Sequence, residues 1–344
     1  MAEPLVSVVT PVYNTEKYLS ECIESVLRQS YTNWEYVILD NCSTDGSAEI
    51  ARSYAARDPR IRVVSNSVFL PVIQNWNTAL RQISSESKYC KVVHADDWLF
   101  PNCLSEMVSL MEAHPSVGLT SSYRLVEAKV TLDGLPYPST IVSGREICRG
   151  SLLKQFYVFG SPTSLLMRCD LVRRKPDFYN SANLHADTEV CFELLRDSDF
   201  GFVHQVLTFT RRHNEATTSY ARRLNTFLGG DLTCLVRYGP EYLSNEEYQQ
   251  RFRRAMDGYY RFLARKFLAG KATQELWTYH RIELGKLGLK LDRTKLMRGC
   301  LAVLKERILN PAGTAEAIVA RLGFNGTDRS KLLQAPHADA LRKS

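Results

Sequence analysis

Short hydrophobic runs alternate with amphipathic segments over the first 120 residues of the chain. Runs rich in Val and Ile, with few polar positions, are typical of strands buried on both faces. The segments between them place apolar residues three or four positions apart, as in a helix with one face against a core. Such an alternation predicts a mostly parallel, twisted sheet with helices on both faces. The expected strands are 5–14, 34–40, 61–64 and 89–93, and the expected helices are 15–30, 41–57 after a turn, 76–83 and 102–113.

The alternation breaks down after residue 120. A hairpin is expected around Asp133 and Gly134, because Asp-Gly is a frequent two-residue turn. From about residue 221 the pattern is helical, with arginines opposite an apolar face. We therefore expect an α/β domain over residues 1–218 and a basic helical region over 219–344. Further elements are predicted as strands at 161–168 and 200–213, and as helices at 186–198, 281–288, 293–308 and 312–322.

The positive charge is confined to the C-terminal third. The chain carries 44 Lys and Arg against 37 Asp and Glu, a net charge of +7. Residues 1–215 alone sum to −4, whereas residues 216–344 sum to +11. Such an asymmetry indicates that the basic region meets something anionic, such as a membrane surface. A set of solvated helix faces rich in Arg and Lys is the open alternative.

The cysteines and the apolar runs exclude several classes of protein. No run approaches the ~20 consecutive apolar residues of a membrane span. The N-terminus is acidic, with Glu3, and a strand is expected from Leu5, so no secretory signal is expected. Nine cysteines, an odd number without a C-x-x-C pair, predict neither a disulfide framework nor a zinc site. Because no disulfide is expected, the predicted location is the reducing cytoplasm. The protein is also expected to contact the inner face of the membrane peripherally.

Acidic residues stand at the ends of two predicted strands. Asp40 ends one strand, and Asp96 and Asp97 follow another. The carboxyl ends of parallel strands meet at one edge of a sheet, where ligands bind. A divalent cation would offset the repulsion between the two adjacent carboxylates, and Mg²⁺ typically takes one or two carboxylates plus substrate phosphates. The alternative, that the pair caps the helix near Asn102 or lies in a solvated turn, stays open at this point.

Four segments together resemble the family 2 inverting glycosyltransferases, enzymes with a GT-A fold that use nucleotide-diphosphate sugars. Residues 6–47, "VSVVTPVYN…LDNCSTDGS", resemble the family's N-terminal signature. "HADDWLFP" (94–101) resembles its D-x-D region, and "ADTEVCFELL" (186–195) its later acidic motif. "TRRHNEATTS" (210–219) resembles the Arg-x-His segment that follows. The resemblance covers residues 5–218 and implies a GT-A fold with a helical C-terminal extension.

The resemblance implies a role for each matching residue. Asp187 would be the catalytic base, and Asp97 and His213 would contact the metal. The family's pattern is broken at three positions, where Asn41 replaces a frequent second Asp, His94 replaces a further Asp, and Ala186 replaces a Glu. The expected nucleotide-binding residues are Pro11, Tyr13, Asp40 and Asp96. From the sequence alone, Asp187 also fits an ordinary helix N-terminus, and His213 also fits a basic strand end.

The implied activity is metal-dependent transfer of a sugar, with inversion, from a nucleotide diphosphate to a glycan or lipid-linked acceptor. Mn²⁺ or Mg²⁺ is the expected cofactor and a UDP-sugar the expected donor, in the biosynthesis of a bacterial surface polysaccharide. No nucleic acid partner is expected. The alternatives are a nucleotidyltransferase and a non-catalytic sugar-nucleotide-binding protein. A glycine-rich phosphate loop would favour a nucleotidyltransferase or a dehydrogenase, but "TPVYNTEKY" (10–18) contains no glycine.

Overall fold

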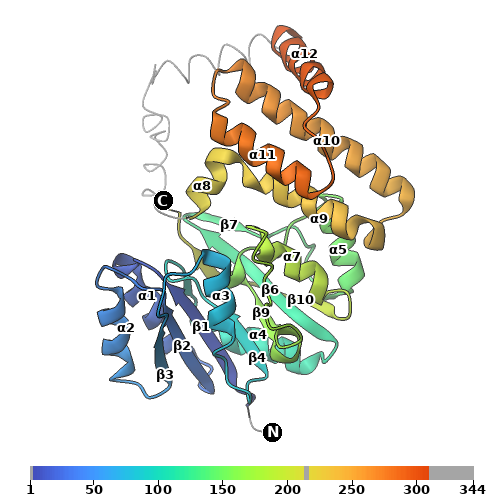
Figure 1. Ribbon diagram of the computed structural model, residues 1–344. Helices are drawn as coiled ribbons and strands as arrows, with labels where there is room; N and C mark the ends of the chain where they lie inside the picture. The colour runs from blue at the N-terminus through green and yellow to red at the C-terminus, as the bar shows by residue number, and fades with distance from the viewer. Residues whose placement is uncertain (1–2, 213–216, 310–344) are drawn as a thin grey trace, which may run out of the picture. The chain divides into compact units, whose positions relative to one another are not determined.

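The computed structural model describes residues 3–212 and 217–309. The part of the chain before residue 212 is built on a sheet of mixed direction with helices against it (Figure 1). Four parallel strands come first, in the spatial order β3-β2-β1-β4. Every residue of β1 is buried, including the polar Ser7 and Thr10. The bounds of these strands are β1 Val6–Val12, β2 Trp34–Asp40, β3 Ile61–Ser65 and β4 Tyr89–Val92.

The second half of the sheet mixes directions. The long strands β6 (Val117–Val126) and β10 (Asp199–Thr210) are parallel to each other. Short antiparallel strands join them to the rest: β9 lies between β4 and β6, and β5 lies at the outer edge beside β10. The short strands are β5 Trp98–Leu99, β7 Lys129–Thr131, β8 Ile141–Val142 and β9 Leu166–Arg168.

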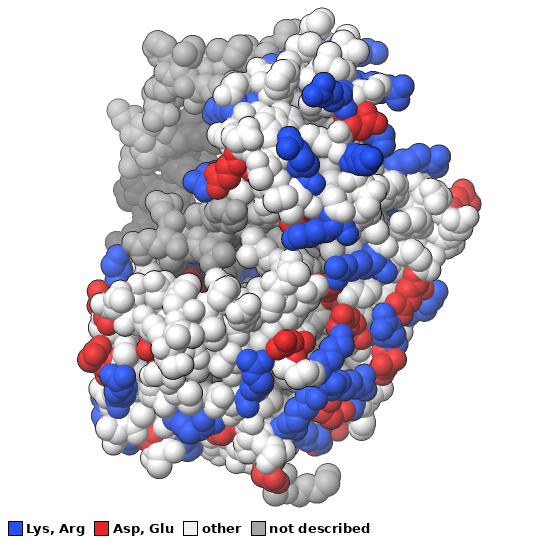
Figure 2. All heavy atoms as spheres, in the orientation of Figure 1, with Lys and Arg blue, Asp and Glu red and all other residues white. Residues whose placement is uncertain are grey.

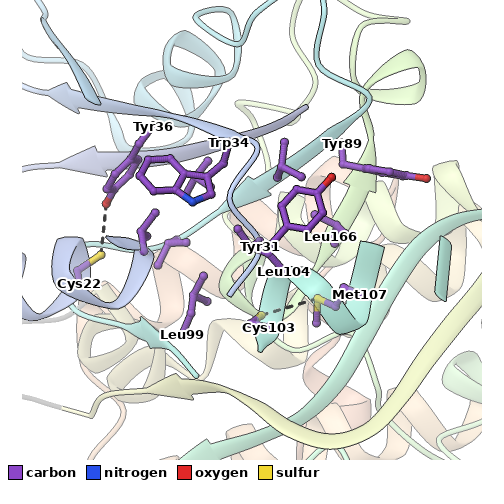
Figure 3. Packing of buried hydrophobic residues seen from close by; sticks show 14 of the residues in the cluster. Cys22, Tyr31, Trp34, Tyr36, Tyr89, Leu99, Cys103, Leu104, Met107 and Leu166 are labelled. Carbon is purple, nitrogen blue, oxygen red and sulfur yellow. Dashed lines mark hydrogen bonds between the residues drawn. The ribbon is translucent and has the colours of Figure 1, made fainter. Parts of the chain in front are cut away.

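Helices pack against this sheet. The first four are α1 (Glu16–Leu27), α2 (Ser47–Ala55), α3 (Val72–Leu80) and α4 (Cys103–Ala113). Figure 3 shows how α1 joins the core, with the hydroxyl of Tyr36 on β2 pointing toward the thiol of Cys22. The same hydroxyl lies 2.8 Å from Thr10 Oγ1 on β1, so two strands and a helix share one buried polar contact. The later helices of this part are α5 Gly144–Leu152, α6 Cys169–Val172 and α7 Ala186–Leu194.

The predicted hairpin around Asp133 and Gly134 is wrong. The hairpin lies at 127–128 instead, because Val126 pairs with Lys129 and Glu127 adopts a left-handed conformation with φ 53°. Gly134 serves a different purpose. A Cβ atom on it would lie 2.5 Å from Cβ of Phe156, so the glycine is needed for close packing.

The predicted strand at 161–168 forms only at its C-terminal end. Pro162–Ser164 is a 3₁₀ turn, labelled η1, and the strand is confined to Leu166–Arg168. Proline has no N–H to donate to a sheet and fixes its own φ, which favours a turn here. Thr163 therefore lies in the turn and not in the strand, and its buried side chain can form hydrogen bonds at the edge of the sheet.

The C-terminal helices fall into two compact units of the chain, which divide after Arg254. The first unit includes α8 (Thr217–Leu224), α9 (Thr226–Tyr242) and the start of α10 (Asn245–Leu268). The functional boundary expected after residue 218 stays a prediction. The helix predicted at 312–322 lies outside the described residues. Within the described ranges, no helix is both long enough and apolar enough to cross a bilayer.

The second unit is built from the rest of α10 with α11 (Gln274–Lys286) and α12 (Arg293–Leu309). Its small core contains Ala264, Cys300 and Val303. Gly299 allows α12 to approach α10 closely, since a Cβ there would lie 2.9 Å from the carbonyl oxygen of Tyr260. One face of α12 is therefore fixed against α10.

Candidate active site

The carboxyl ends of β1, β2 and β4 form one edge of the parallel half of the sheet. The strand register pairs Val12 with Asp40 and Val9 with Val92. Asp40 therefore lies beside the end of β1, and the segment that carries Asp96 and Asp97 leaves β4 on the other side. The structure thus brings together the strand ends that the sequence singled out.

The expected nucleotide-binding residues differ in exposure. Pro11 is buried within β1, whereas Tyr13 is 46% exposed and its ring lies 4.8 Å from the ring of Phe69. Asp40 is buried, and its Oδ1 accepts a hydrogen bond of 3.2 Å from the N–H of Ser43. An exposed aromatic pair beside a buried carboxylate can stack against a planar base while the carboxylate accepts a hydrogen bond from it.

Asn41, one of the departures from the family's pattern, holds a loop. Its Nδ2 donates to the carbonyl of Leu70 at 2.8 Å, and its Oδ1 accepts from the N–H of Leu70 at 2.9 Å. The same oxygen accepts from Nδ2 of Asn66 at 2.8 Å. These bonds fix residues 66–70 over the end of β2, and Phe69 with them. The asparagine side chain therefore acts within the protein, on the loop that presents Phe69.

Three ligating side chains gather at the end of β4. One ligand atom each from His94, Asp96 and Asp97 lies within 4.8 Å of the others. Asp97 is 3% exposed and receives hydrogen bonds from Thr163 Oγ1 (2.7 Å) and from the N–H of Arg211 (3.1 Å). Burial raises the pKa of the Asp97 carboxyl to about 7; the charge of Asp96 adds to this rise, and the two hydrogen bonds oppose it. A positive charge beside the pair would reverse this effect.

His94 completes the group. Burial lowers the pKa of its imidazole, against the charges of Asp96 and Asp187, which raise it. The neutral imidazole is the form that binds metals. Its ring lies 4.8 Å from that of Trp76, and its buried Nε2 has no hydrogen-bond partner among the described residues. A buried nitrogen without a partner beside two carboxylates fits a divalent cation. His213, the other expected metal contact, lies outside the described residues.

Asp187 lies in the first turn of α7, half-buried. Its Oδ1 accepts a hydrogen bond of 2.8 Å from the N–H of Thr188. Burial raises the pKa of the Asp187 carboxyl, while the charge of His185 and the Thr188 hydrogen bond lower it. The charge of Asp187 raises the pKa of the His94 imidazole, and the charge of His94 lowers the pKa of the Asp187 carboxyl. A carboxylate with a raised pKa is a better proton acceptor than an ordinary one.

Sequence reasoning missed Thr163 and undervalued Arg211. Thr163 Oγ1 accepts from the N–H of His94 at 3.1 Å and donates to Asp97, so it connects two of the proposed ligands. Arg211 donates its N–H to Asp97 and its Nε to the carbonyl of Asp96 at 3.2 Å. No motif marks Thr163, because its contact depends on the 3₁₀ turn. Arg211 was marked only as part of the Arg-x-His segment and of the basic pair after β10.

Glu189, two residues beyond Asp187, supports the segment before α7. Its Oε2 accepts from Nδ2 of Asn183 at 2.7 Å and from Nδ2 of Asn180 at 3.1 Å. Its Oε1 is paired with Arg237 of α9. Both carboxylate oxygens of this buried residue are therefore occupied, and Asp187 is the more accessible of the two acids.

A family model described as glycosyl transferase family 2 matches residues 7–174, just under half of the chain. Residues 7–174 are therefore similar to glycosyl transferase family 2. The matched segment contains Asp40 and the His94–Asp96–Asp97 group, and the family's expected base, Asp187, follows it.

Two proteins of Bacillus subtilis are similar to the family 2 segment. The candidate glycosyltransferase EpsE is 32% identical over 157 residues, which are 44% of this chain and 56% of EpsE. TuaG, a candidate glycosyltransferase of teichuronic acid biosynthesis, is 33% identical over 132 residues, or 38% of this chain and 52% of TuaG. The matched part thus spans about half the length of each relative.

Two solved structures share the fold. TarS 1–349 of S. aureus, in complex with UDP-GlcNAc, has a TM-score of 0.60 at 17% identity, covering 82% of this chain and 80% of TarS. The mannosyltransferase PcManGT from Pyrobaculum calidifontis, in complex with GDP-Man and Mn²⁺, has a TM-score of 0.52 at 15% identity, covering 89% of each. The predicted GT-A fold class, with its helical C-terminal part, is confirmed.

Proposed function

We propose that the protein transfers a sugar from a nucleotide-diphosphate donor, with a divalent cation as cofactor. The observation that carries the proposal is the group His94, Asp96 and Asp97, whose ligand atoms lie within 4.8 Å of one another at the carboxyl end of β4. Asp40 and Tyr13 lie at the ends of β2 and β1, and Asp187 lies in the first turn of α7. In this proposal Asp40 and Tyr13 would contact the base, the group would hold the cation and the diphosphate, and Asp187 would act at the sugar.

Asp96, Asp97 and His94 would hold the cation, and Asp96 would also contact the nucleotide. When bound, the cation stabilises the negative charge that develops on the leaving diphosphate. Thr163 and Arg211 keep Asp97 in place by donating to its carboxylate. His213 is proposed to close over the same region. Mn²⁺ fits a mixed set of imidazole and carboxylate ligands, and Mg²⁺ is the alternative.

Asp187 is proposed as the base that removes the proton from the attacking hydroxyl. Its raised pKa and its partial exposure suit a residue that must accept a proton from a substrate. In-line attack by that hydroxyl would invert the anomeric centre. A general base at this point also distinguishes a transferase from a protein that only binds the nucleotide.

The donor is proposed to be a UDP-sugar, with Pro11, Tyr13 and Asp40 lining the base pocket. Support comes from the TarS structures, which hold UDP-GlcNAc or UDP, although PcManGT holds GDP-Man. The acceptor is proposed to be a glycan or a lipid-linked glycan of a bacterial surface polysaccharide. TuaG, named for teichuronic acid biosynthesis, supports this class.

A donor panel tests the proposal. The purified protein is titrated with UDP-glucose, UDP-GlcNAc, UDP-galactose and GDP-mannose in the presence of Mn²⁺, and release of the free nucleotide is then followed. We expect one UDP-sugar to bind more tightly than the rest and to release UDP at a rate that depends on Asp187. Binding without release by the wild type, with a range of glycan acceptors present, would favour the non-catalytic alternative.

A further inference from the structure

The helix α12 carries a stripe of exposed apolar side chains that no element of its own unit covers among the described residues. The stripe repeats every three or four positions, so its members share one face of the helix. Large apolar side chains gathered on one face mark an interaction surface more often than single exposed ones do. The members and their exposed fractions are Met297 (58%), Leu301 (65%), Leu304 (41%) and Ile308 (76%).

The opposite face of α12 is already used. Gly299, Cys300 and Val303 are buried against α10, and Glu306 pairs with Arg261 and with Arg265 of that helix. The helix is therefore fixed in rotation, and the stripe is exposed because the other face packs. Rotation of α12 to bury the stripe would break both the small core and the ion pairs.

Positive charges border the stripe on both sides. At 100° per residue, Arg298 and Lys305 flank one edge, and Arg293 and Arg307 flank the other. All four residues are exposed. Arg293–Leu309 contains five Lys and Arg and one acid, Glu306, which lies on the packed side. Figure 2 shows Lys and Arg outnumbering Asp and Glu over the helices of this unit.

We propose that this face of α12 docks on an anionic lipid membrane. An apolar stripe between rows of cations suits the boundary between acyl chains and anionic headgroups, where the stripe is buried and the cations meet phosphates. The proposal assigns the membrane contact expected for the basic C-terminal region to one face of one helix. The proposed docking does not depend on the proposed transfer reaction.

Two other occupants fit the charge less well. A second copy would place the cation rows of two α12 helices against each other, and like charges that face each other repel. The 35 residues after Leu309 carry five Lys and Arg and three Asp and Glu, so this segment also has a positive net charge. Neither would place an excess of negative charge opposite the rows of cations.

Co-sedimentation of the full-length protein with vesicles tests the proposal. The vesicles are phosphatidylcholine alone or phosphatidylcholine with phosphatidylglycerol. We expect binding only to the anionic vesicles, weakened by salt. Arg298→Gln/Lys305→Gln should weaken it about fivefold for each cation removed. Leu301→Gln/Ile308→Gln should weaken it at least about tenfold, since less apolar surface is buried.

The control variant Arg281→Gln/Ile282→Gln removes one cation and one exposed apolar side chain, 52% exposed, from α11. It should bind anionic vesicles as the wild type does. Circular dichroism and light scattering of every variant report folding and oligomeric state. The proposal is overturned by equal binding to both vesicle types, by no binding, or by equal loss in the α11 control. Self-association that is lost in Leu301→Gln/Ile308→Gln, without vesicle binding, would identify a second copy as the occupant.

Discussion

Thr163 connects two parts of the proposed cation site through one hydroxyl. Its Oγ1 accepts the backbone N–H of His94 and donates to Asp97, and the residue is fully buried. A hydrogen bond to a buried carboxylate fixes its orientation and favours its charged form. At this scale, the geometry of the site depends on a residue that carries no charge.

Thr163→Val keeps the shape of the side chain but removes both hydrogen bonds. We expect the free energy of unfolding to fall by about 1–3 kcal/mol, because a buried N–H and a buried carboxylate each lose a partner. We also expect Mn²⁺ affinity, measured by calorimetry, to fall about tenfold or more. Thr163→Ser keeps the hydroxyl and serves as the matched control. Equal Mn²⁺ affinity in the valine and serine variants would show that Thr163 does not support the site.

Asp187→Asn removes the proposed proton acceptor and keeps its shape. General-base catalysis typically contributes ~10²–10⁴-fold, so the transfer rate should drop by about that factor. Donor affinity should stay within a few-fold, and thermal stability should barely change, because Asn is also favourable near a helix start. Asp177→Asn, an exposed carboxylate 69% accessible in its ion pair with Arg81, is the control and should leave the rate unchanged. A transfer rate near that of the wild type in Asp187→Asn would show that Asp187 is not the base and only stabilises the start of the helix.

The sequence predicted Asp40, Asp96 and Asp97 because they follow apolar runs, and strand ends of a parallel sheet converge. Asp187 was expected only through the resemblance to the family. Thr163 could not be found this way. Its contact with Asp97 spans 66 positions and exists only because Pro162 starts a turn. His94 was noted only as a departure from the family's pattern, since its burial and its unpartnered Nε2 are properties of the folded chain.

At the scale of elements, the loop 66–70 is positioned by Asn41 rather than by its own sequence. Asn41 donates to and accepts from the backbone of Leu70, and the loop carries Phe69 against Tyr13. The sequence placed Asn41 at the base pocket through the family's pattern. It could not show that the amide side chain would form its hydrogen bonds with the loop 66–70.

Asn41→Asp, which restores the residue frequent in the family, should harm this protein. The new carboxylate oxygen would face the carbonyl of Leu70, where Nδ2 now donates at 2.8 Å. Loss of that bond and the repulsion should lower the free energy of unfolding by about 1–3 kcal/mol. UDP affinity should fall with it, because Phe69 is released. Asn102→Asp, an exposed residue before α4, is the control. Tighter UDP binding by Asn41→Asp would show that position 41 contacts the base directly.

The sequence also failed to show some contacts that determine where strands and turns form. Periodicity identified the parallel strands and the helices that cover them, since buried strands and amphipathic helices have different repeats. It misplaced the hairpin, because Asp133-Gly134 has the composition of a turn. Gly134 is required instead by the nearby Phe156 side chain, and a contact of that kind leaves no periodic signal.

At the scale of the whole molecule, the two parts of the chain differ in net charge. The sequence located the +11 charge in residues 216–344. It could not show which face of α12 is exposed, because that helix is apolar on two sides and only its packing on α10 selects one. The surface proposed for membrane contact is therefore a product of tertiary structure, whereas the excess of cations is a property of the sequence.

In the proposed function, Asp96 and Asp97 bind a nucleotide diphosphate through a divalent cation. Calorimetric titration of UDP into the wild-type protein, in Mn²⁺ and then in chelator, tests it most directly. We predict that affinity falls at least about tenfold, or about 1.4 kcal/mol, in chelator and recovers when Mn²⁺ or Mg²⁺ is restored. Asp97→Asn in Mn²⁺ should bind as weakly as the wild type in chelator, while Asp177→Asn should bind normally. Undiminished UDP binding in chelator would show that the two aspartates do not bind the nucleotide through a cation.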